Sequence, residues 1–214
     1  MRSHPYAHAS RLPEGEDLAP SGLLDSPGER TELEVGPGRG SFLLERVQTE
    51  ATLSMVGLEV RWKWAAIVDQ RLRTMGLGER ARVFAEDARV ALPRFRTASL
   101  SAVFVHFPDP WWKRRHGKRR VITPALVREV QRLLVPGGEF FVQTDVEERA
   151  IEYEAAVRAC SELEPWGDSA RVAESPFIAR SPRERRVELD GLPVVRLRYR
   201  RTTAPSSSSS LTPG

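Results

Sequence analysis

The sequence predicts an α/β fold, with a Rossmann-like, doubly wound and mostly parallel sheet of seven strands. Between residues 31 and 160, short apolar stretches typical of strands alternate with segments of helical periodicity. This alternation is typical of a parallel sheet with helices on both faces. After residue 166 the alternation weakens, and two further β-rich stretches predict an antiparallel strand pair at the C-terminal end.

Each expected element follows from local composition and periodicity. We expect parallel strands at residues 31–36, 53–60, 81–85, 101–107 and 139–144. We expect helices at residues 41–47, 62–75, 123–134 and 147–160, with Pro136-Gly137-Gly138 ending the third helix. The antiparallel pair is expected at residues 171–173 and 192–199, joined by an arginine-rich connection.

The two ends of the chain differ from the predicted domain. Residues 1–30 contain four prolines and little apolar periodicity, which predicts an irregular N-terminal extension. Residues 203–214 form a serine-rich tail of the kind that stays disordered. The sequence therefore predicts one domain over residues 31–202.

The positive charge is concentrated in one place. The net charge of the 214 residues is +4, yet residues 111–120 hold six basic side chains and no acidic one, so the rest is net acidic. Such a patch indicates a polyanionic partner. A single cysteine, Cys160, excludes an intramolecular disulfide and a cysteine-rich zinc site. Because no apolar stretch is long enough for a membrane helix, we expect a soluble cytoplasmic protein without a metal or a membrane partner.

Three glycines alternate directly after the first predicted strand, at Gly36, Gly38 and Gly40. Glycine permits backbone angles and a close approach that a Cβ atom would prevent. A ligand can therefore lie over the strand ends at the start of the next helix. A dinucleotide-binding loop would have glycine at position 41, where this chain has Ser41, which is evidence against NAD.

Two acidic residues follow the next two predicted strands. Glu59 can accept hydrogen bonds from both ribose hydroxyls of a nucleoside, and Asp87 can meet an adenine amino group. Either carboxylate could instead cap the helix that follows it. Together with the glycine loop, both acids favour a nucleoside ligand, and the pattern is the usual one for S-adenosylmethionine.

The fourth predicted strand ends in Pro108-Asp109-Pro110. Two prolines stiffen the chain and hold the Asp109 carboxylate at the carboxyl edge of the sheet, where ligands of open α/β sheets bind. The basic run that follows is flanked by Trp111 and Trp112, a combination suited to phosphate contacts and base stacking on RNA. Trp62 and Trp64, in the second predicted helix, are interpreted as packing residues.

With these motifs assembled, the chain resembles the bacterial tRNA (guanine-N7-)-methyltransferases. The most specific match is the string PDPWWKRRHGKRR, which begins at Pro108. Supporting matches are LEVGPGRG, GLEVRWKW, the Asp87-Ala88 pair, and Gln143-Thr144-Asp145 after the fifth strand. The resemblance covers residues 32–160 well and the remainder loosely.

The resemblance implies methyl transfer from S-adenosyl-L-methionine to N7 of a guanine in tRNA, at variable-loop position 46. It implies cofactor contacts from Glu34, Gly36, Gly38, Gly40, Glu59, Asp87, Ala88 and Asp109, with Asp109 also the catalytic acid. It implies substrate contacts from Lys113, Asp145, Ser175, Arg115, His116 and Arg119. At the segment where the family has T-x-F-E, this chain reads Ser175-Pro176-Phe177-Ile178, so the hydroxyl is kept and the acid is replaced.

Other functions stay open from the sequence. An NAD-dependent oxidoreductase would explain the glycine loop and Glu59, but not the basic run or the Asp109 turn. A non-catalytic RNA-binding protein would explain the basic run, but not the cofactor acids. Methylation of another nucleophile is opposed only by the family resemblance. Both a monomer and a homodimer are compatible with the sequence.

Overall fold

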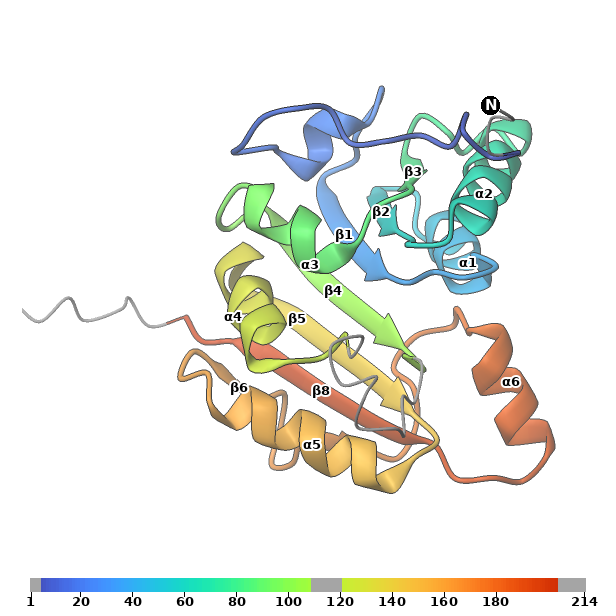
Figure 1. The fold of residues 1–214 in the computed structure, drawn as a ribbon. Helices are drawn as coiled ribbons and strands as arrows, with labels where there is room; N and C mark the ends of the chain where they lie inside the picture. Colours follow the sequence, from blue (N-terminus) through green and yellow to red (C-terminus); the bar gives the residue numbers. More distant parts are fainter. Residues whose placement is uncertain (1–4, 109–120, 204–214) are drawn as a thin grey trace, which may run out of the picture.

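A computed structural model describes residues 5–108 and 121–203, which form one sheet with helices on both faces (Figure 1). The strands are β1 (Arg30–Val35), β2 (Leu53–Leu58), β3 (Ala81–Phe84), β4 (Leu100–His106), β5 (Leu134–Thr144), β6 (Leu163–Pro165), β7 (Arg171–Val172) and β8 (Val195–Arg201). The helices are α1 (Ser41–Thr49), α2 (Trp62–Thr74), α3 (Ala88–Ala91), α4 (Pro124–Leu133), α5 (Glu147–Arg158) and α6 (Pro182–Leu189), with 3-10 turns η1 (Pro20–Leu23) and η2 (Leu92–Arg94).

The order of the strands in the sheet indicates where a ligand would bind. Along the sheet the strands run β3-β2-β1-β4-β5-β8-β6, with β1 to β5 parallel and β8 antiparallel to β5. The chain moves outward from β1 to β3 and then returns to β4 on the other side of β1. This is a topological switch point, and ligands of such sheets bind outside the carboxyl ends of the strands there.

The sheet has eight strands where the sequence predicts seven, because two short strands share one side of β8. β6 pairs with residues 199–201 of β8, and β7 pairs with residues 196–197. The sheet is therefore still seven positions wide. The predicted antiparallel pairing between the stretch at Arg171 and the last strand is confirmed as β7 with β8.

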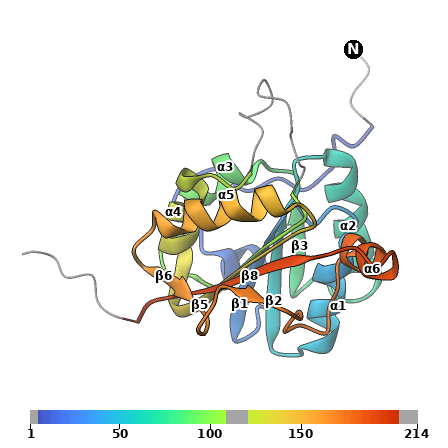
Figure 2. The ribbon, with the colours of Figure 1, turned by 90° about the horizontal axis from the view of Figure 1, so that it is seen from below.

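Two apolar layers hold the helices to the sheet. One layer joins α3, α4 and α5 to the face that carries Val103 and Phe140, and the other joins α1 and α2 to the face that carries Phe104 and Phe141 (Figure 2). These side chains are fully buried. This double cover explains why the strands have nearly continuous apolar sequences instead of an alternating pattern.

The connection before β8 contains a helix that the sequence analysis missed. Residues 182–189 form α6, although the sequence predicts an arginine-rich connection there. The Ser181 hydroxyl accepts a hydrogen bond from the Glu184 N–H at 3.1 Å, and Pro182 occupies the first turn. Ser-x-x-Glu with proline after the serine is a helix-start signal. It was missed because the segment has almost no apolar periodicity.

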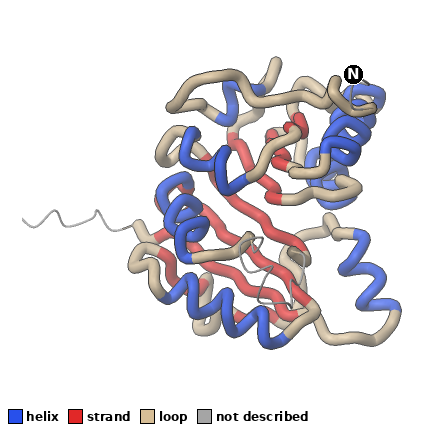
Figure 3. Tube along the Cα trace, in the orientation of Figure 1, coloured by secondary structure: helices blue, strands red, loops and turns tan. Residues whose placement is uncertain are grey.

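The described part of the N-terminal segment contains η1 and no longer helix or strand, and it crosses β3 and α2 (Figure 3). The Ser10 carbonyl accepts from the Ala85 N–H at 2.8 Å, and the Ser10 hydroxyl donates to Asp69 at 2.9 Å. Arg11 pairs with Glu86 at 2.8 Å. These contacts fix the segment beside the carboxyl end of β3.

We predict that Gly40→Ala destabilises the protein by about 3 kcal/mol. Gly40 has a φ of +75°, and an added Cβ would lie 2.4 Å from a Val68 methyl carbon, so left-handed strain adds to overpacking. Gly76→Ala is the matched control, because Gly76 has a φ of +71° with nothing within 4 Å of the added Cβ. It should cost only about 1 kcal/mol. Urea unfolding measures both, and equal losses would contradict the close approach.

Candidate functional site

The loop between β1 and α1 has the backbone that the sequence predicts. Gly36, Gly38 and Gly40 have φ values of +72°, +55° and +75°. L-residues with side chains rarely adopt this left-handed region, which explains the three glycines. Gly40 also packs α1 against Val68 of α2. The loop therefore turns sharply at the switch point and leaves its backbone open at Gly36, which is exposed.

The Glu59 carboxylate joins this loop to the start of α2. One oxygen, Oε2, accepts from the Gly38 N–H at 2.9 Å. The other, Oε1, accepts from the Arg61 backbone N–H at 2.9 Å and from the Arg61 Nε at 3.1 Å. Glu59 is only 2% exposed. A carboxylate oxygen has two lone pairs, so Oε1 is fully used by Arg61, whereas Oε2 retains the capacity to accept from one ligand hydroxyl.

A second buried carboxylate, Glu34, pairs with His106 across neighbouring strands. Glu34 Oε1 lies 2.8 Å from His106 Nδ1, and both side chains are at least 97% buried. Among the described residues, the remaining atoms Glu34 Oε2 and His106 Nε2 have no hydrogen-bond partner. Buried polar atoms are nearly always satisfied, so these two mark a place where a ligand supplies the missing partners.

His106 was not among the sequence-predicted site residues. Its ring packs 4.1 Å from the Phe42 ring, which holds it in place. The next residue, Phe107, has a φ of +45°, an uncommon value for a residue with a side chain. The only signal in the sequence is the position of His106 at the end of a strand, directly before the proline turn.

Glu34, His106 and the glycine loop line one cavity of about 370 Å³, within the size range of small-molecule sites. Glu59 is not among the lining residues, but it holds two of them, Gly38 and Arg61. The cavity lies at the carboxyl ends of β1, β4 and β5, as the switch point requires. Its lining residues are Glu34, Gly36, Pro37, Gly38, Arg39, Arg61, His106, Phe107, Pro108, Thr144, Asp145, Ser181, Pro182 and Arg183. Strand ends and the glycine loop thus form one side, and the first residues of α6 the other.

Asp145, predicted to bind substrate, is held by a residue that the sequence analysis did not single out. Arg183 of α6 donates to the Asp145 carboxylate through Nε at 3.1 Å and also through Nη2. Arg183 is more than half exposed, whereas Asp145 is mostly buried. The Arg183–Asp145 ion pair closes one side of the cavity, and a charged ligand can compete with either partner for the other.

Glu184 fixes α6 to the sheet below. It is 1% exposed and accepts from Gln143 of β5 at 2.6 Å and from Arg196 of β8 at 3.1 Å. Ser175, also predicted to bind substrate, is not among the residues that line this cavity, and its hydroxyl accepts from the Phe177 N–H at 3.4 Å. Phe177 packs against Phe104 at 5.2 Å between ring centroids. The substrate role of Ser175 stays a prediction.

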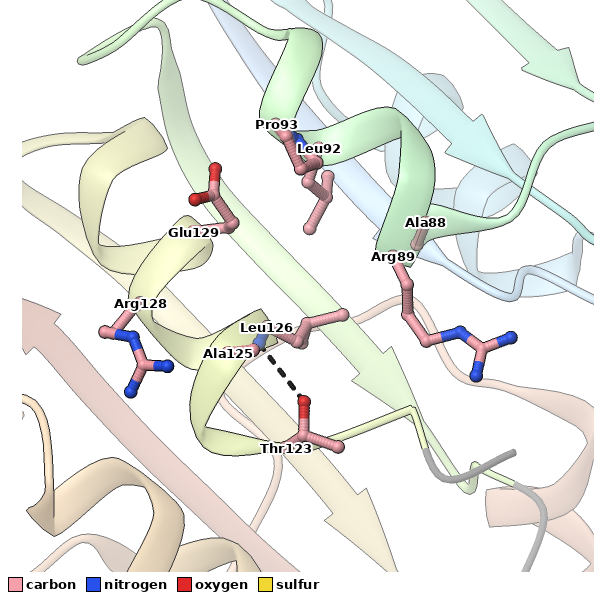
Figure 4. A pocket seen from close by; sticks show the side chains of 9 residues that line it. All are labelled: Ala88, Arg89, Leu92, Pro93, Thr123, Ala125, Leu126, Arg128 and Glu129. Carbon is pink, nitrogen blue, oxygen red and sulfur yellow. Dashed lines mark hydrogen bonds between the residues drawn. The ribbon is translucent and has the colours of Figure 1, made fainter. Parts of the chain in front are cut away.

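Neither Asp87 nor Ala88 lines this cavity, and Ala88 lines a different one. Asp87 is the N-cap of α3, where its carboxylate accepts from the Arg89 N–H at 3.0 Å. The Arg89 guanidinium also bonds this carboxylate and lowers the pKa of Asp87 below its usual value. Ala88 lines a space of about 330 Å³ between α3 and the start of α4, where Thr123 caps α4 (Figure 4). Asp87 thus caps the helix that follows it, as the alternative interpretation of the sequence has it. The cofactor role of Asp87 stays a prediction.

Five predicted site residues lie outside the described residues: Asp109, Lys113, Arg115, His116 and Arg119. The last described residue before them, Pro108, lines the cavity with Glu34. In the described part of the chain, no group of three or more metal-ligating side chains is placed to hold a metal ion. Nor does any helix in that part have the length and apolar character to cross a bilayer.

We predict that Glu184→Gln loosens α6 and costs about 2 to 4 kcal/mol of unfolding free energy, because the substitution removes the charge that pairs with the buried Arg196. Glu188→Gln is the control, since Glu188 contacts the same guanidinium but is 45% exposed. It should cost less than about 1 kcal/mol. Urea unfolding compares the two, and equal costs would contradict an anchoring role specific to Glu184.

Comparison with known proteins identifies the family. A family described as putative methyltransferase matches residues 29–197. The chain is 39% identical to the tRNA (guanine-N(7)-)-methyltransferase of Myxococcus xanthus, over 78% of this chain and 81% of that protein. The enzyme of the same name from Synechococcus sp. WH7803 is 35% identical, over 96% and 89% of the two chains.

Among solved structures, TrmN from Thermus thermophilus superimposes with a TM-score of 0.57 at 18% identity, over 84% of this chain and 46% of that one. At that identity the likeness shows the fold alone, and the sequence relatives carry the assignment. The Rossmann-like fold and the family resemblance predicted from the sequence are both confirmed. The chain belongs to the tRNA (guanine-N7-)-methyltransferase family.

Proposed function

We propose that this protein transfers a methyl group from S-adenosyl-L-methionine to N7 of a guanine in tRNA, at variable-loop position 46 by family resemblance. The observation that carries the proposal is the buried Glu34 carboxylate beside the glycine loop of a chain in this family, with one oxygen that no described residue bonds. A tRNA-modifying enzyme of this kind would work in the cytoplasm, as a monomer or a homodimer.

The residues of the cavity fit the proposed cofactor. S-adenosyl-L-methionine supplies an activated methyl group on a sulfonium. Its ammonium group can supply the donors that Glu34 Oε2 lacks among the described residues, and Glu59 Oε2 can accept from a ribose hydroxyl. The open backbone of the glycine loop lets a ligand lie against Gly36 and Gly38. The volume of about 370 Å³ is within the usual range for such a ligand.

Methyl transfer to guanine N7 depends on the positioning of the two reactants more than on proton transfer. Guanine N7 has an in-plane lone pair and no hydrogen at neutral pH, so no general base is needed. The main task of the protein is to hold the nucleophile and the methyl group in line. The rigid strand ends of β1, β4 and β5, fixed by the apolar layers on both faces, are suited to this task.

Carboxylates stabilise the positive charge that the base gains on methylation. We assign this charge stabilisation and the recognition of the guanine N1–H and amino edge to Asp109 and Asp145 together. Asp145 lines the cavity directly after β5, where it contacts Arg183 of α6. Arg183, which pairs with it, can exchange its carboxylate contact for a phosphate of the bound RNA. The basic side chains Lys113, Arg115 and Arg119, with His116, would contact the tRNA backbone, and salt should weaken their contribution.

The direct test is mass spectrometry of nucleosides from tRNA incubated with the enzyme and S-adenosyl-L-methionine. We expect N7-methylguanosine from a transcript with guanosine at position 46. A matched transcript, ligated to carry 7-deazaguanosine at that position, lacks the nucleophilic nitrogen and should give none. A different methylated nucleoside, or equal incorporation into both transcripts, would refute N7 of this guanine as the target.

A further inference from the structure

An aromatic and basic surface lies at the start of α2, outside the cavity described above. Tyr6, Trp62 and Trp64 line a second, wide hollow of about 630 Å³, together with Val60, Arg61 and Lys63. Trp62 is 38% exposed, so of the core or surface packing that the sequence suggests for it, the structure shows a surface position. Tyr6 comes from the N-terminal segment, so the surface joins two distant parts of the sequence.

Cations lie close to both indole rings. The Arg11 guanidinium is 5.4 Å from the Trp62 ring centroid. The Arg39 guanidinium and the Lys63 ammonium are 5.3 Å and 5.6 Å from the Trp64 ring. These distances suit cation–π contacts, which hold the rings in place, while Trp62 stays exposed and Trp64 partly exposed.

The acidic residues near this surface face inward. Glu59 is almost wholly buried, and the Glu86 side chain is 13% exposed. Glu59 accepts from Arg61, and Glu86 accepts from Arg11. Solvent therefore meets the guanidinium and ammonium groups, and an approaching partner meets positive charge beside aromatic rings. Only Val60 adds exposed aliphatic surface here, which disfavours an apolar protein partner.

The surface is continuous with the proposed cofactor cavity. Arg61 lines both hollows, and Arg39, which contacts Trp64, belongs to the glycine loop that lines the cavity. A polymer with one base at the cavity can therefore bring a neighbouring nucleotide to Trp62 and Trp64. Aromatic rings with adjacent cations are the usual means of binding unpaired bases and their phosphates.

We propose that Tyr6, Trp62 and Trp64, with Arg11, Arg39, Arg61 and Lys63, bind an unstacked nucleobase and its phosphate in the tRNA substrate. This inference rests on the proposed function for the identity of the RNA. It adds a second RNA contact to the one proposed for the basic run at residues 113–120. It also explains why Trp62 and Trp64 lie partly exposed in the first turn of α2.

The test measures binding of an unmodified tRNA transcript by fluorescence anisotropy, with S-adenosylhomocysteine saturating. Trp62→Ala and Trp64→Ala should each weaken binding about tenfold, and the Phe variants, which keep a ring, by less than about threefold. Trp166→Ala is the matched control, because Trp166 also carries a guanidinium, that of Arg198, at 4.2 Å but lies on the connection between β6 and β7. It should bind tRNA like the wild type.

Lys63→Glu is a second variant that leaves the packing intact, because Lys63 is exposed. It should weaken tRNA binding and lower the slope of log affinity against log salt by about one or more. Calorimetry with S-adenosylhomocysteine should give the wild-type affinity for Trp62→Ala and Lys63→Glu.

Unchanged tRNA affinity in the Trp62→Ala/Trp64→Ala double variant would overturn the proposal, as would wild-type tRNA binding by Lys63→Glu. A parallel loss of S-adenosylhomocysteine affinity would overturn it too, by assigning the surface to the cofactor cavity. Binding is measured without methyl transfer, so the two proposals fail separately. Wild-type protein that binds tRNA through these residues but forms no N7-methylguanosine would refute the proposed function alone.

Discussion

The Glu59 carboxylate is the contact on which the rest of the site depends. It holds the Gly38 N–H on one side and the Arg61 N–H on the other, so the glycine loop and the first turn of α2 share one buried charge. The proposed cofactor cavity lies on the loop side, and the aromatic and basic surface on the α2 side. A substitution of Glu59 should therefore change both the cofactor cavity and the aromatic and basic surface. A substitution of the exposed Trp62 should change the aromatic and basic surface alone.

The opposite wall of the cavity depends on tertiary contacts of α6. This helix is short and polar, and its position is set by Glu184 against Gln143 and Arg196. Its exposed Arg183 pairs with Asp145 at the end of β5. This short helix thus supplies a cavity wall through Ser181, Pro182 and Arg183.

Sequence reasoning was most successful where local rules decide the structure. The alternating glycines predicted left-handed backbone, and strand periodicity predicted the parallel core, since both depend on neighbouring residues alone. His106 and Arg183 were missed because their importance comes from Glu34 and Asp145, which are distant in sequence. Asp87 caps the following helix through the Arg89 N–H, a local contact that the sequence offered as an alternative to the cofactor role. Family membership decides against the oxidoreductase alternative, which the glycine loop alone left open.

The central claim is that S-adenosyl-L-methionine binds in the cavity that the glycine loop lines, beside the Glu59 carboxylate that holds this loop. Calorimetric titration of Glu59→Gln with S-adenosylhomocysteine tests it most directly, because the amide keeps the size of the side chain and removes its charge and one acceptor. We predict an affinity at least about tenfold below that of the wild type, corresponding to the loss of charge-assisted hydrogen bonds. A folded Glu59→Gln protein with wild-type affinity for S-adenosylhomocysteine would contradict the account.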